Sequence, residues 1–311
     1  MGEGLKFGEA APMLAQTAPE PFDGRDWLFE VKWDGYRALA FLDRGKGTRL
    51  QSRRLRDLTA SYPDLAGLHG LLESGSAVVD GELVALRDGR PDFQTLQGGG
   101  RPVLFVAFDL LQLEDDVLLH RPLAERRRLL EERLGQGPEL VHSGGVVGAG
   151  VEFHRAAVDR GLEGTVAKRL DSLYYPGRRT RDWLKVRNVH RGFALALGYT
   201  RAADARPIGA LTLGVVDEDG VLVYAGHAGT GFDEREARRL VDILGPPAGC
   251  PLRGGTPREL RGRTTWVNPR HVVEVEFLEW TRDRRFRHPV YRGLRPDKDA
   301  ADCRMPEVGV R

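Results

Sequence analysis

Apolar residues in the first 190 positions mostly follow the short runs and the alternation typical of β-strands. Two runs, 27–33 and 36–43, flank Asp34-Gly35, a dipeptide typical of tight turns, so the pattern predicts a β-hairpin over residues 27–44. Further strands are expected over residues 76–86, 102–113, 163–170 and 182–188. Apolar positions at helical spacing predict two helices, over residues 121–135, ending at Gly135, and over residues 148–161.

The pattern changes near Arg191 to short strands with a single helix. We expect strands over residues 193–200, 209–216, 220–228 and 272–280, and a helix over residues 233–245. Several short strands with one helix indicate a small β-barrel. The chain is therefore expected to be α+β, with one domain of antiparallel sheets and helices over residues 1–189 and a barrel domain over residues 190–311.

The composition narrows the classes of function. The 311 residues carry a net charge of only +2, so any surface that binds nucleic acid must be a local basic patch. The two cysteines, Cys250 and Cys303, lie far apart, which excludes a disulfide scaffold and argues against a zinc ribbon. No apolar run approaches the length of a membrane span, and no signal peptide is visible. A reducing, cytosolic setting without membrane contact is expected.

One lysine stands out in the stretch "FEVKWDGYRA" (residues 29–38). Lys32 interrupts an apolar, strand-like run, with acids two positions before and two positions after it. As a lone lysine it would be a surface residue that protects a strand edge. The alternative is a nucleophile, since a neutral lysine amine can attack phosphorus if burial or nearby cations favour the neutral form. That hypothesis requires further acids and bases at strand ends.

The chain contains such residues in order. They lie in "DGE" (80–82), "FVAFD" (105–109), "EGTVAKR" (163–169) and "WLKVR" (183–187), each expected at a strand end or turn. Any one of these motifs is weak by itself, and Phe108 alone is more typical of a core residue. Together and in this order they form a specific pattern.

This order of motifs resembles the covalent nucleotidyltransferases, which include DNA ligases, RNA ligases and mRNA capping enzymes. "PMLA" (12–15), "FVAFDLL" and "RFRHPVYRGLRPDK" are similar to ATP-dependent DNA ligases, in particular to the ligase module of bacterial end-joining ligases. The resemblance covers nearly the whole chain. It implies a nucleotidyltransferase (adenylation) domain followed by an OB-fold barrel, and it implies the sealing of 5′-phosphate/3′-hydroxyl nicks through a lysyl-adenylate and a DNA-adenylate.

The resemblance also implies roles for individual residues. Lys32 attacks the α-phosphate of ATP, and Glu30 lies near the adenine edge. Phe108 stacks on the adenine, and Arg37 and Glu82 address the ribose. The cations expected around the α-phosphate are Lys168, Lys185 and Arg187.

The expected metal is Mg²⁺ or Mn²⁺, with Glu82 and Glu163 as its carboxylate ligands. Asp34 has two interpretations of equal weight, as a metal ligand or as a turn residue. Ser52-Arg53 falls where the family has a pair that binds the 5′-phosphate of the nick. The family then has a glycine soon afterwards, whereas this chain continues Arg54-Leu55-Arg56, which leaves the loop geometry open. We interpret Arg54 and Arg56 as a solvated basic face.

The basic C-terminal stretch 281–298 resembles the last ligase motif. By that resemblance Arg295, Asp297 and Lys298 orient pyrophosphate during the first step only, with Arg287 as a weaker candidate. The barrel would then rotate between steps about residues 188–192, and would hold duplex DNA by its phosphates.

The expected partner is nicked duplex DNA, bound by a monomer in the bacterial cytoplasm in association with the nucleoid. An end-binding repair protein is a further expected partner, because no DNA-encircling domain fits before Glu30. The alternatives are an RNA ligase or capping-type enzyme and a non-catalytic nucleic-acid-binding relative. An NAD-dependent ligase is disfavoured by the absence of zinc-binding cysteines. The sequence leaves open whether the substrate is a nick, a gap or a double-strand break.

Overall fold

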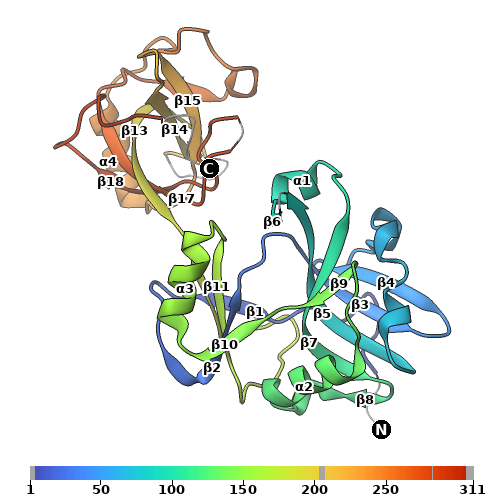
Figure 1. The fold of residues 1–311 in the computed structure, drawn as a ribbon. Coiled ribbons are helices and arrows are strands. Elements are labelled where there is room, and N and C mark those ends of the chain that lie inside the picture. The colour runs from blue at the N-terminus through green and yellow to red at the C-terminus, as the bar shows by residue number, and fades with distance from the viewer. Residues whose placement is uncertain (1–3, 88, 203–206, 282, 306–311) are drawn as a thin grey trace. The chain divides into compact units, whose positions relative to one another are not determined.

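The chain folds into two compact units, Met1–Asn188 and Val189–Arg311 (Figure 1). The computed structural model describes residues 4–87, 89–202, 207–281 and 283–305. The break between the units falls after Asn188, and the expected domain boundary after residue 189 stays a prediction. No helix within the described ranges is both long and apolar enough to cross a bilayer.

The larger sheet of the first unit has seven strands in the order β4-β3-β5-β7-β8, with β6 paired to β5 and β9 paired to β7. Helix α2 packs against β7 and α1 against β5. These elements are β3 (Tyr36–Asp43), β4 (Gly47–Ser52), β5 (Ser76–Arg87), β6 (Arg90–Pro91), β7 (Val103–Leu113), β8 (Asp116–Val117), β9 (Leu140–His142), α1 (Phe93–Gln97) and α2 (Leu123–Arg133).

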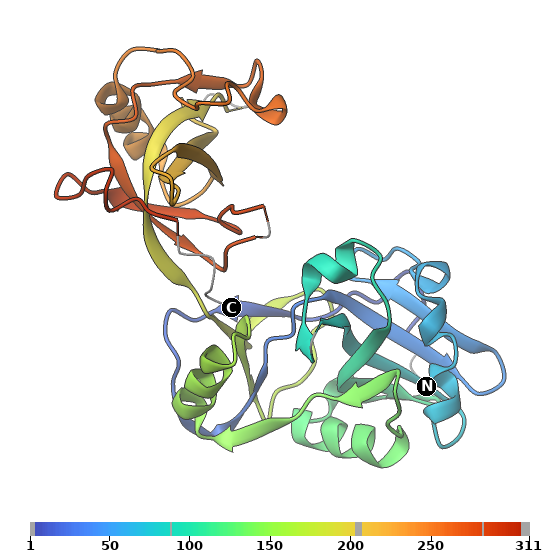
Figure 2. The same ribbon diagram turned by 45° about the horizontal axis from the view of Figure 1, so that its top comes forward.

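The second sheet of this unit has five strands in the order β1-β12-β11-β2-β10, covered by α3 (Figure 2). Its elements are β1 (Leu14–Thr17), β2 (Gly24–Val31), β10 (Gly145–Gly148), β11 (Gly164–Arg169), β12 (Arg179–Arg187) and α3 (Gly150–Asp159). A small apolar cluster joins the two sheets. It brings Leu39 and Phe108 of the first sheet against Met13, Tyr174 and Trp183 beside and on the second. The polar side chains described below lie next to this cluster.

The second unit is built on a curved antiparallel sheet in the order β15-β14-β13-β17-β18, with β16 paired to β13. The far edges approach each other, since Phe286 N donates to Ala225 O at 2.9 Å and Tyr291 N to Thr230 O at 3.0 Å. The elements are β13 (His190–Thr200), β14 (Ala210–Val216), β15 (Leu222–Ala228), β16 (Thr264–Trp266), β17 (Val272–Phe277), β18 (Val290–Leu294) and α4 (Glu234–Leu244).

The predicted hairpin over residues 27–44 is wrong. The strands β2 and β3 do form on either side of Asp34-Gly35, but β2 pairs with β10 and β11 while β3 pairs with β4 and β5. A two-residue hairpin turn of the expected type needs positive φ at its central residues, and neither Asp34 nor Gly35 has it. Gly35 instead allows close packing, because a Cβ there would lie 2.0 Å from Leu83 O.

The expectation that the acidic and aromatic motifs end their strands is also wrong for two of them. Glu82 lies in the middle of β5, and Phe108 lies in the middle of β7. Asp80 pairs with Asp109 but Gly81 pairs with Ala107, so Phe108 is an extra residue in a β-bulge. Bulges bend a strand and redirect side chains, which explains how a mid-strand residue faces the second sheet.

Candidate active site

A cavity of about 190 Å³ opens between the two sheets of the first unit. Its walls come from seven strands, β1, β2, β3, β5, β7, β11 and β12, and the segments beside them. The lining includes eight residues expected from the sequence, and these are Glu30, Lys32, Arg37, Arg53, Glu82, Phe108, Lys168 and Lys185.

Lys32 directly follows β2 and is fixed at its backbone and at its amine. Its N–H donates to Gly164 O at 2.9 Å, and its Nζ donates to Glu163 Oε2. Glu163 precedes β11, and its carbonyl accepts from Asn188 N at 2.8 Å. Gly164 has φ +136°, and a Cβ there would lie 2.1 Å from Val186 O. A glycine is therefore required at this crossing, which holds the carboxylate of Glu163 beside Lys32.

Glu30 lies two residues before Lys32 and is buried between two cations. Arg127 Nη1 donates to its Oε1 at 2.8 Å, and Lys168 Nζ forms an ion pair with its Oε2. Burial lowers the pKa of Lys168, although Glu30 opposes that effect. Both oxygens of Glu30 are thus engaged by cations, and the carboxylate is an acceptor held in one orientation.

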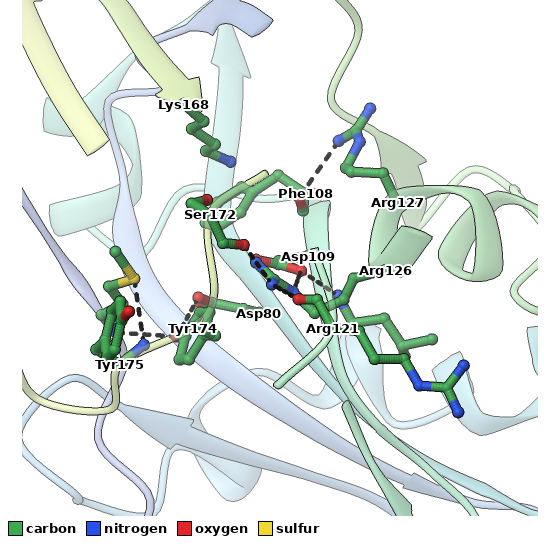
Figure 3. Close-up of polar contacts among 12 residues, drawn as sticks. Asp80, Phe108, Asp109, Arg121, Arg126, Arg127, Lys168, Ser172, Tyr174 and Tyr175 are labelled. Carbon is green, nitrogen blue, oxygen red and sulfur yellow. Dashed lines mark hydrogen bonds and ion pairs between the residues drawn. The ribbon is translucent and has the colours of Figure 1, made fainter. Parts of the chain in front are cut away.

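The ring of Phe108 also faces two cations in the cavity. Arg37 Cζ lies 4.4 Å and Lys168 Nζ lies 4.1 Å from the ring centroid (Figure 3 shows Lys168 beside Phe108). Arg37 is held by Asp80 through two bonds of 2.6 Å, and Tyr174 Oη donates to Asp80 at 2.5 Å. The guanidinium expected near a ribose is therefore positioned by a buried carboxylate.

Glu82 and Lys185 have strongly altered acid–base properties in the cavity. Burial raises the pKa of Glu82 to about 8, with Asp80 and Glu163 acting in the same direction. Partial burial lowers the pKa of Lys185 to about 8, helped by the positive charges of Arg187 and Lys32. Perturbed groups of opposite charge in one cleft are typical of a site that handles protons and phosphates.

The expected metal ligands are only partly brought together. No group of three or more carboxylate, histidine or cysteine side chains within the described ranges is placed to hold a metal ion. The roles of Glu82 and Glu163 as metal ligands, and the two interpretations of Asp34, stay predictions. Glu82 and Glu163 are close enough to influence each other, and Asp34 does not line the cavity.

Arg187 and Arg53, both expected at phosphates, differ in their position relative to the cavity. Arg187 ends β12 with an exposed side chain and does not line the cavity. Arg53 does line the cavity. It lies in a turn in which Leu55 has φ +63°. The left-handed conformation costs a non-glycine residue about 1–2 kcal/mol. The turn therefore has a backbone conformation that favours glycine, although leucine occupies the position.

Sequence profiles match both units of the chain. The ATP dependent DNA ligase domain matches residues 12–187, and the ATP dependent DNA ligase C terminal region matches residues 204–298. The chain belongs to the ATP-dependent DNA ligase family. The expected fold is confirmed, a nucleotidyltransferase domain followed by an OB-fold domain.

Relatives of this ligase chain include much longer proteins. The multifunctional non-homologous end joining DNA repair protein LigD of Mycobacterium tuberculosis is 38% identical over 310 residues, covering 96% of this chain and 40% of the relative. LigD of Pseudomonas aeruginosa is 37% identical over 305 residues, which cover 94% of this chain and 36% of the relative. The chain thus spans less than half the length of these relatives. DNA ligase C1 of Mycolicibacterium smegmatis is 32% identical over 338 residues, covering 96% and 93%.

Solved ligase structures share this architecture. A mycobacterial DNA ligase D complexed with ATP and MES has a TM-score of 0.59 and 37% identity, covering 96% of this chain and 99% of that one. A Lig E DNA ligase has 19% identity and a TM-score of 0.57 and shares the fold. The match covers 90% of this chain and 99% of that one.

The second unit of the ligase chain carries the expected C-terminal cations. Arg295 donates to Asp297 through bonds of 2.8 and 2.7 Å and to Glu274 at 3.0 Å. Lys298 Nζ donates to Asp302 Oδ1 at 3.1 Å. Both cations are thus paired within their own unit, and their role toward a nucleotide stays a prediction.

Sequence reasoning missed three residues around the cavity. Arg127 reaches Glu30 from α2, Asp80 positions Arg37, and Arg179 lines the cavity from β12. The run of three arginines in the helix 121–135 was a usable signal, because a helix cannot expose three consecutive side chains equally. Arg126, next to Arg127, is fully buried and pairs with Asp109 through two bonds of 2.8 Å (Figure 3).

Proposed function

We propose that this chain is an ATP-dependent DNA ligase that seals 5′-phosphate/3′-hydroxyl nicks in duplex DNA, in DNA repair or end joining. The observation that carries the proposal is the position of Lys32. Its amine lies against Glu163 in a cavity that also collects Glu30, Phe108 and Lys185 from separate strands. Such convergence favours a nucleophile over a lysine that guards a strand edge.

In the first step the neutral Lys32 amine attacks the α-phosphorus of ATP. A P–N bond forms, the bond from that phosphorus to the pyrophosphate oxygen breaks, and pyrophosphate leaves. Glu163 Oε2 is positioned to hold the proton that Lys32 loses, since it already accepts from Nζ. Lys185 and Lys168 supply positive charge beside the cavity as charge develops on the phosphate oxygens.

In the second step the AMP moves from Lys32 to the 5′-phosphate of the nick. The P–N bond breaks, a phosphoanhydride bond forms, and Lys32 recovers its proton. In the third step the 3′-hydroxyl attacks the activated 5′-phosphate, a phosphodiester bond forms and AMP leaves. Splitting one difficult joining reaction into these transfers is covalent catalysis.

Glu30 and Phe108 serve recognition of the nucleotide in this proposal. Glu30 is an acceptor fixed by Arg127 and Lys168, which suits a base edge that offers N–H donors. Phe108 provides an aromatic surface at the same wall, and Arg37 stands beside it toward the ribose. Arg187 would act from outside the cavity on the phosphates.

The carboxylates Glu82 and Glu163 fit Mg²⁺ or Mn²⁺, which prefer oxygen donors and commonly use one or two carboxylates together with substrate phosphates. A metal bound there would neutralise charge on the nucleotide phosphates. The absence of a third protein ligand near this pair, within the described ranges, agrees with a site completed by the nucleotide. Asp34 keeps its two interpretations.

We further propose nicked duplex DNA as the partner of a monomeric enzyme in the bacterial cytoplasm, associated with the nucleoid. An end-binding repair protein is proposed as a second partner, because the LigD relatives are end-joining proteins. The second unit would contact DNA phosphates, with Arg295 and Lys298 acting on pyrophosphate in the first step.

Sealing assays on a 5′-phosphorylated nick and on a pre-adenylated nick test this proposal. Lys32→Ala is expected to abolish sealing of the first and to retain sealing of the second, because the third step needs no lysine nucleophile. Lys46→Ala, at an exposed lysine paired with Asp43, is the matched control and is expected to seal both. Sealing of the ordinary nick by Lys32→Ala would overturn the proposal.

A further inference from the structure

The turn formed by residues 53–56 joins an exposed leucine to three arginines beside the cavity. Leu55 is 38% exposed and has φ +63°. In the described part of the chain it is the one apolar residue among the non-glycine residues with positive φ. Strain of this kind persists where the surrounding structure enforces it, and it is common at binding sites.

Ser52 enforces the shape of this turn. Its N–H donates to Arg56 O at 2.9 Å, its carbonyl accepts from Leu55 N at 2.9 Å, and its Oγ accepts from Arg56 N at 3.0 Å. Arg53 N also donates to Arg37 O at 3.3 Å, which ties the turn to β3. The leucine is thus presented to solvent on a fixed backbone.

The arginines of the turn carry charge that the protein does not neutralise. Arg53, Arg54 and Arg56 are exposed, and none forms an ion pair with any residue that the structure describes, whereas neighbouring Arg49 pairs with Asp57 at 3.5 Å. Three unpaired guanidinium groups around an apolar tip match a nucleic-acid strand, which presents phosphates at its edge and apolar base and sugar surfaces between them.

The position of the turn selects which part of the DNA it meets. Arg53 lines the cavity that contains Lys32, and the 5′-phosphate must reach the AMP held there for the second step. Leu55 follows Arg53 by two residues, so their Cα atoms are at most about 7 Å apart. That distance corresponds to about two base steps along one DNA strand.

We propose that Leu55 packs against the nucleoside next to the 5′-phosphate at the strand break, while Arg54 and Arg56 bind the flanking phosphates. This inference rests on the proposed function and names a contact that selects broken ends. Arg54 and Arg56 were interpreted from the sequence as a solvated basic face. In this inference they provide the electrostatic part of the contact with DNA.

Four variants at one position test the apolar contact in the full chain. Leu55→Asn and Leu55→Gly both suit the left-handed backbone but remove the apolar tip, whereas Leu55→Met keeps it and Leu55→Ala shortens it. The KM for a nicked duplex is expected to rise about tenfold for the Asn and Gly variants, the effect of losing one buried leucine side chain. The Met variant is expected to stay within about twofold of wild type, with Ala between.

Two further readouts separate this contact from a structural role. Labelling of the protein by ATP without DNA is expected to be unchanged in all four variants. The melting temperature of Leu55→Gly is expected not to fall. A higher KM for nicked DNA without a loss of stability would separate a DNA contact from a structural role. Leu86→Asn, at another exposed leucine that does not line the cavity, is the matched control and is expected to keep the wild-type KM.

A wild-type KM in both Leu55→Asn and Leu55→Gly would overturn the inference, as would an equal loss in Leu55→Met. If the wild-type protein sealed no nicks, the proposed function would fail instead, so the two failures are distinguishable. Arg54→Gln and Arg56→Gln should each reduce the salt dependence of DNA binding, lowering the slope of log K against log salt by about one. An unchanged slope in both would remove the phosphate contacts from the inference.

Discussion

At the scale of single residues, the cavity places Glu82 and Lys185 where both change charge near the same pH. Burial raises the pKa of Glu82 to about 8, so below that pH it is protonated and a poor metal ligand. Burial and neighbouring cations lower the pKa of Lys185 to about 8, so above that pH its positive charge is lost. In the proposed adenylation step Glu82 binds the metal and Lys185 supplies positive charge, so that step would require the ionised form of both.

We therefore expect a bell-shaped pH profile for kcat/KM of adenylation, with its maximum near about pH 8. The rising limb follows deprotonation of Glu82 and the falling limb follows deprotonation of Lys185. Lys185→Arg keeps its charge at high pH, so it should remove or delay the falling limb while leaving the rising limb in place. A falling limb that is the same in Lys185→Arg and wild type would exclude Lys185 as its origin.

Arg127 acts on Glu30 as a positioning residue. Its Nη1 holds Oε1 of Glu30, and its Nη2 donates to Ser143 O at 2.7 Å. Arg127→Met would leave Glu30 with Lys168 alone in a buried setting. We expect a rise in KM for ATP of about tenfold and a loss of about 3 kcal/mol in the free energy of unfolding.

Two variants control the Arg127 measurement. Arg128→Met removes an exposed arginine paired with Glu132 and should change the free energy of unfolding by less than about 0.5 kcal/mol. Arg127→Lys should recover part of the ATP affinity. Loss of stability in Arg127→Met without any change in KM would show that the residue supports only the fold.

The sequence predicted the residues that line the cavity better than the residues that hold them in place. Lys32, Glu30, Phe108 and Lys185 lie in short motifs whose composition is unusual, and all of them line the cavity. Arg127 and Asp80 contact their partners across 97 and 43 positions of the chain. No local pattern specifies such contacts, which depend on how a helix face and two strands meet.

At the scale of elements, the sequence predicted α2, α3, α4 and most of the longer strands, but it missed β4, α1 and short strands such as β10, and it did not predict the strand pairing. The apolar runs around Asp34-Gly35 do form strands, yet β2 and β3 separate into different sheets. That separation opens the cavity between the sheets and places Lys32 at the end of β2. Turn propensity is a local preference, whereas strand pairing is decided by contacts along the whole sheet.

Gly164 tests how strictly the crossing of β11 and β12 is built. Its φ of +136° and the 2.1 Å approach of a Cβ to Val186 O leave no space for a side chain. Gly164→Ala is expected to lower the free energy of unfolding by about 3 kcal/mol or more, measured by chemical denaturation. Gly67 has φ −85°, and a Cβ there would have no neighbouring atom within 4 Å. Gly67→Ala should therefore leave the free energy of unfolding unchanged within error. Equal effects would contradict the packing argument.

At the scale of the whole molecule, the two units divide the work proposed for the ligase. The change near Arg191 to several short apolar runs with a single helical pattern marked the second unit in the sequence. The sequence carries no comparable signal for how the units are arranged in each step, since that arrangement depends on bound ATP and DNA.

Lys298 tests the proposed role of the second unit in the first step. Its amine pairs with Asp302, so the role requires that it leave this partner for pyrophosphate. Lys298→Ala is expected to slow adenylation by at least about tenfold and to leave the sealing of a pre-adenylated nick within about twofold of wild type. Single-turnover assays of the two steps would check this, and equal slowing of both steps would contradict it.

The most direct test of the central claim is transfer of label from ATP to the protein. The protein is incubated with α-labelled ATP and Mg²⁺ without DNA and run on a denaturing gel, beside labelled GTP and NAD⁺ and beside Lys32→Ala. We predict a labelled band from ATP alone that is absent in Lys32→Ala. Label from GTP would indicate a capping-type enzyme, and no label on folded protein that is free of prior adenylate would contradict covalent catalysis by Lys32.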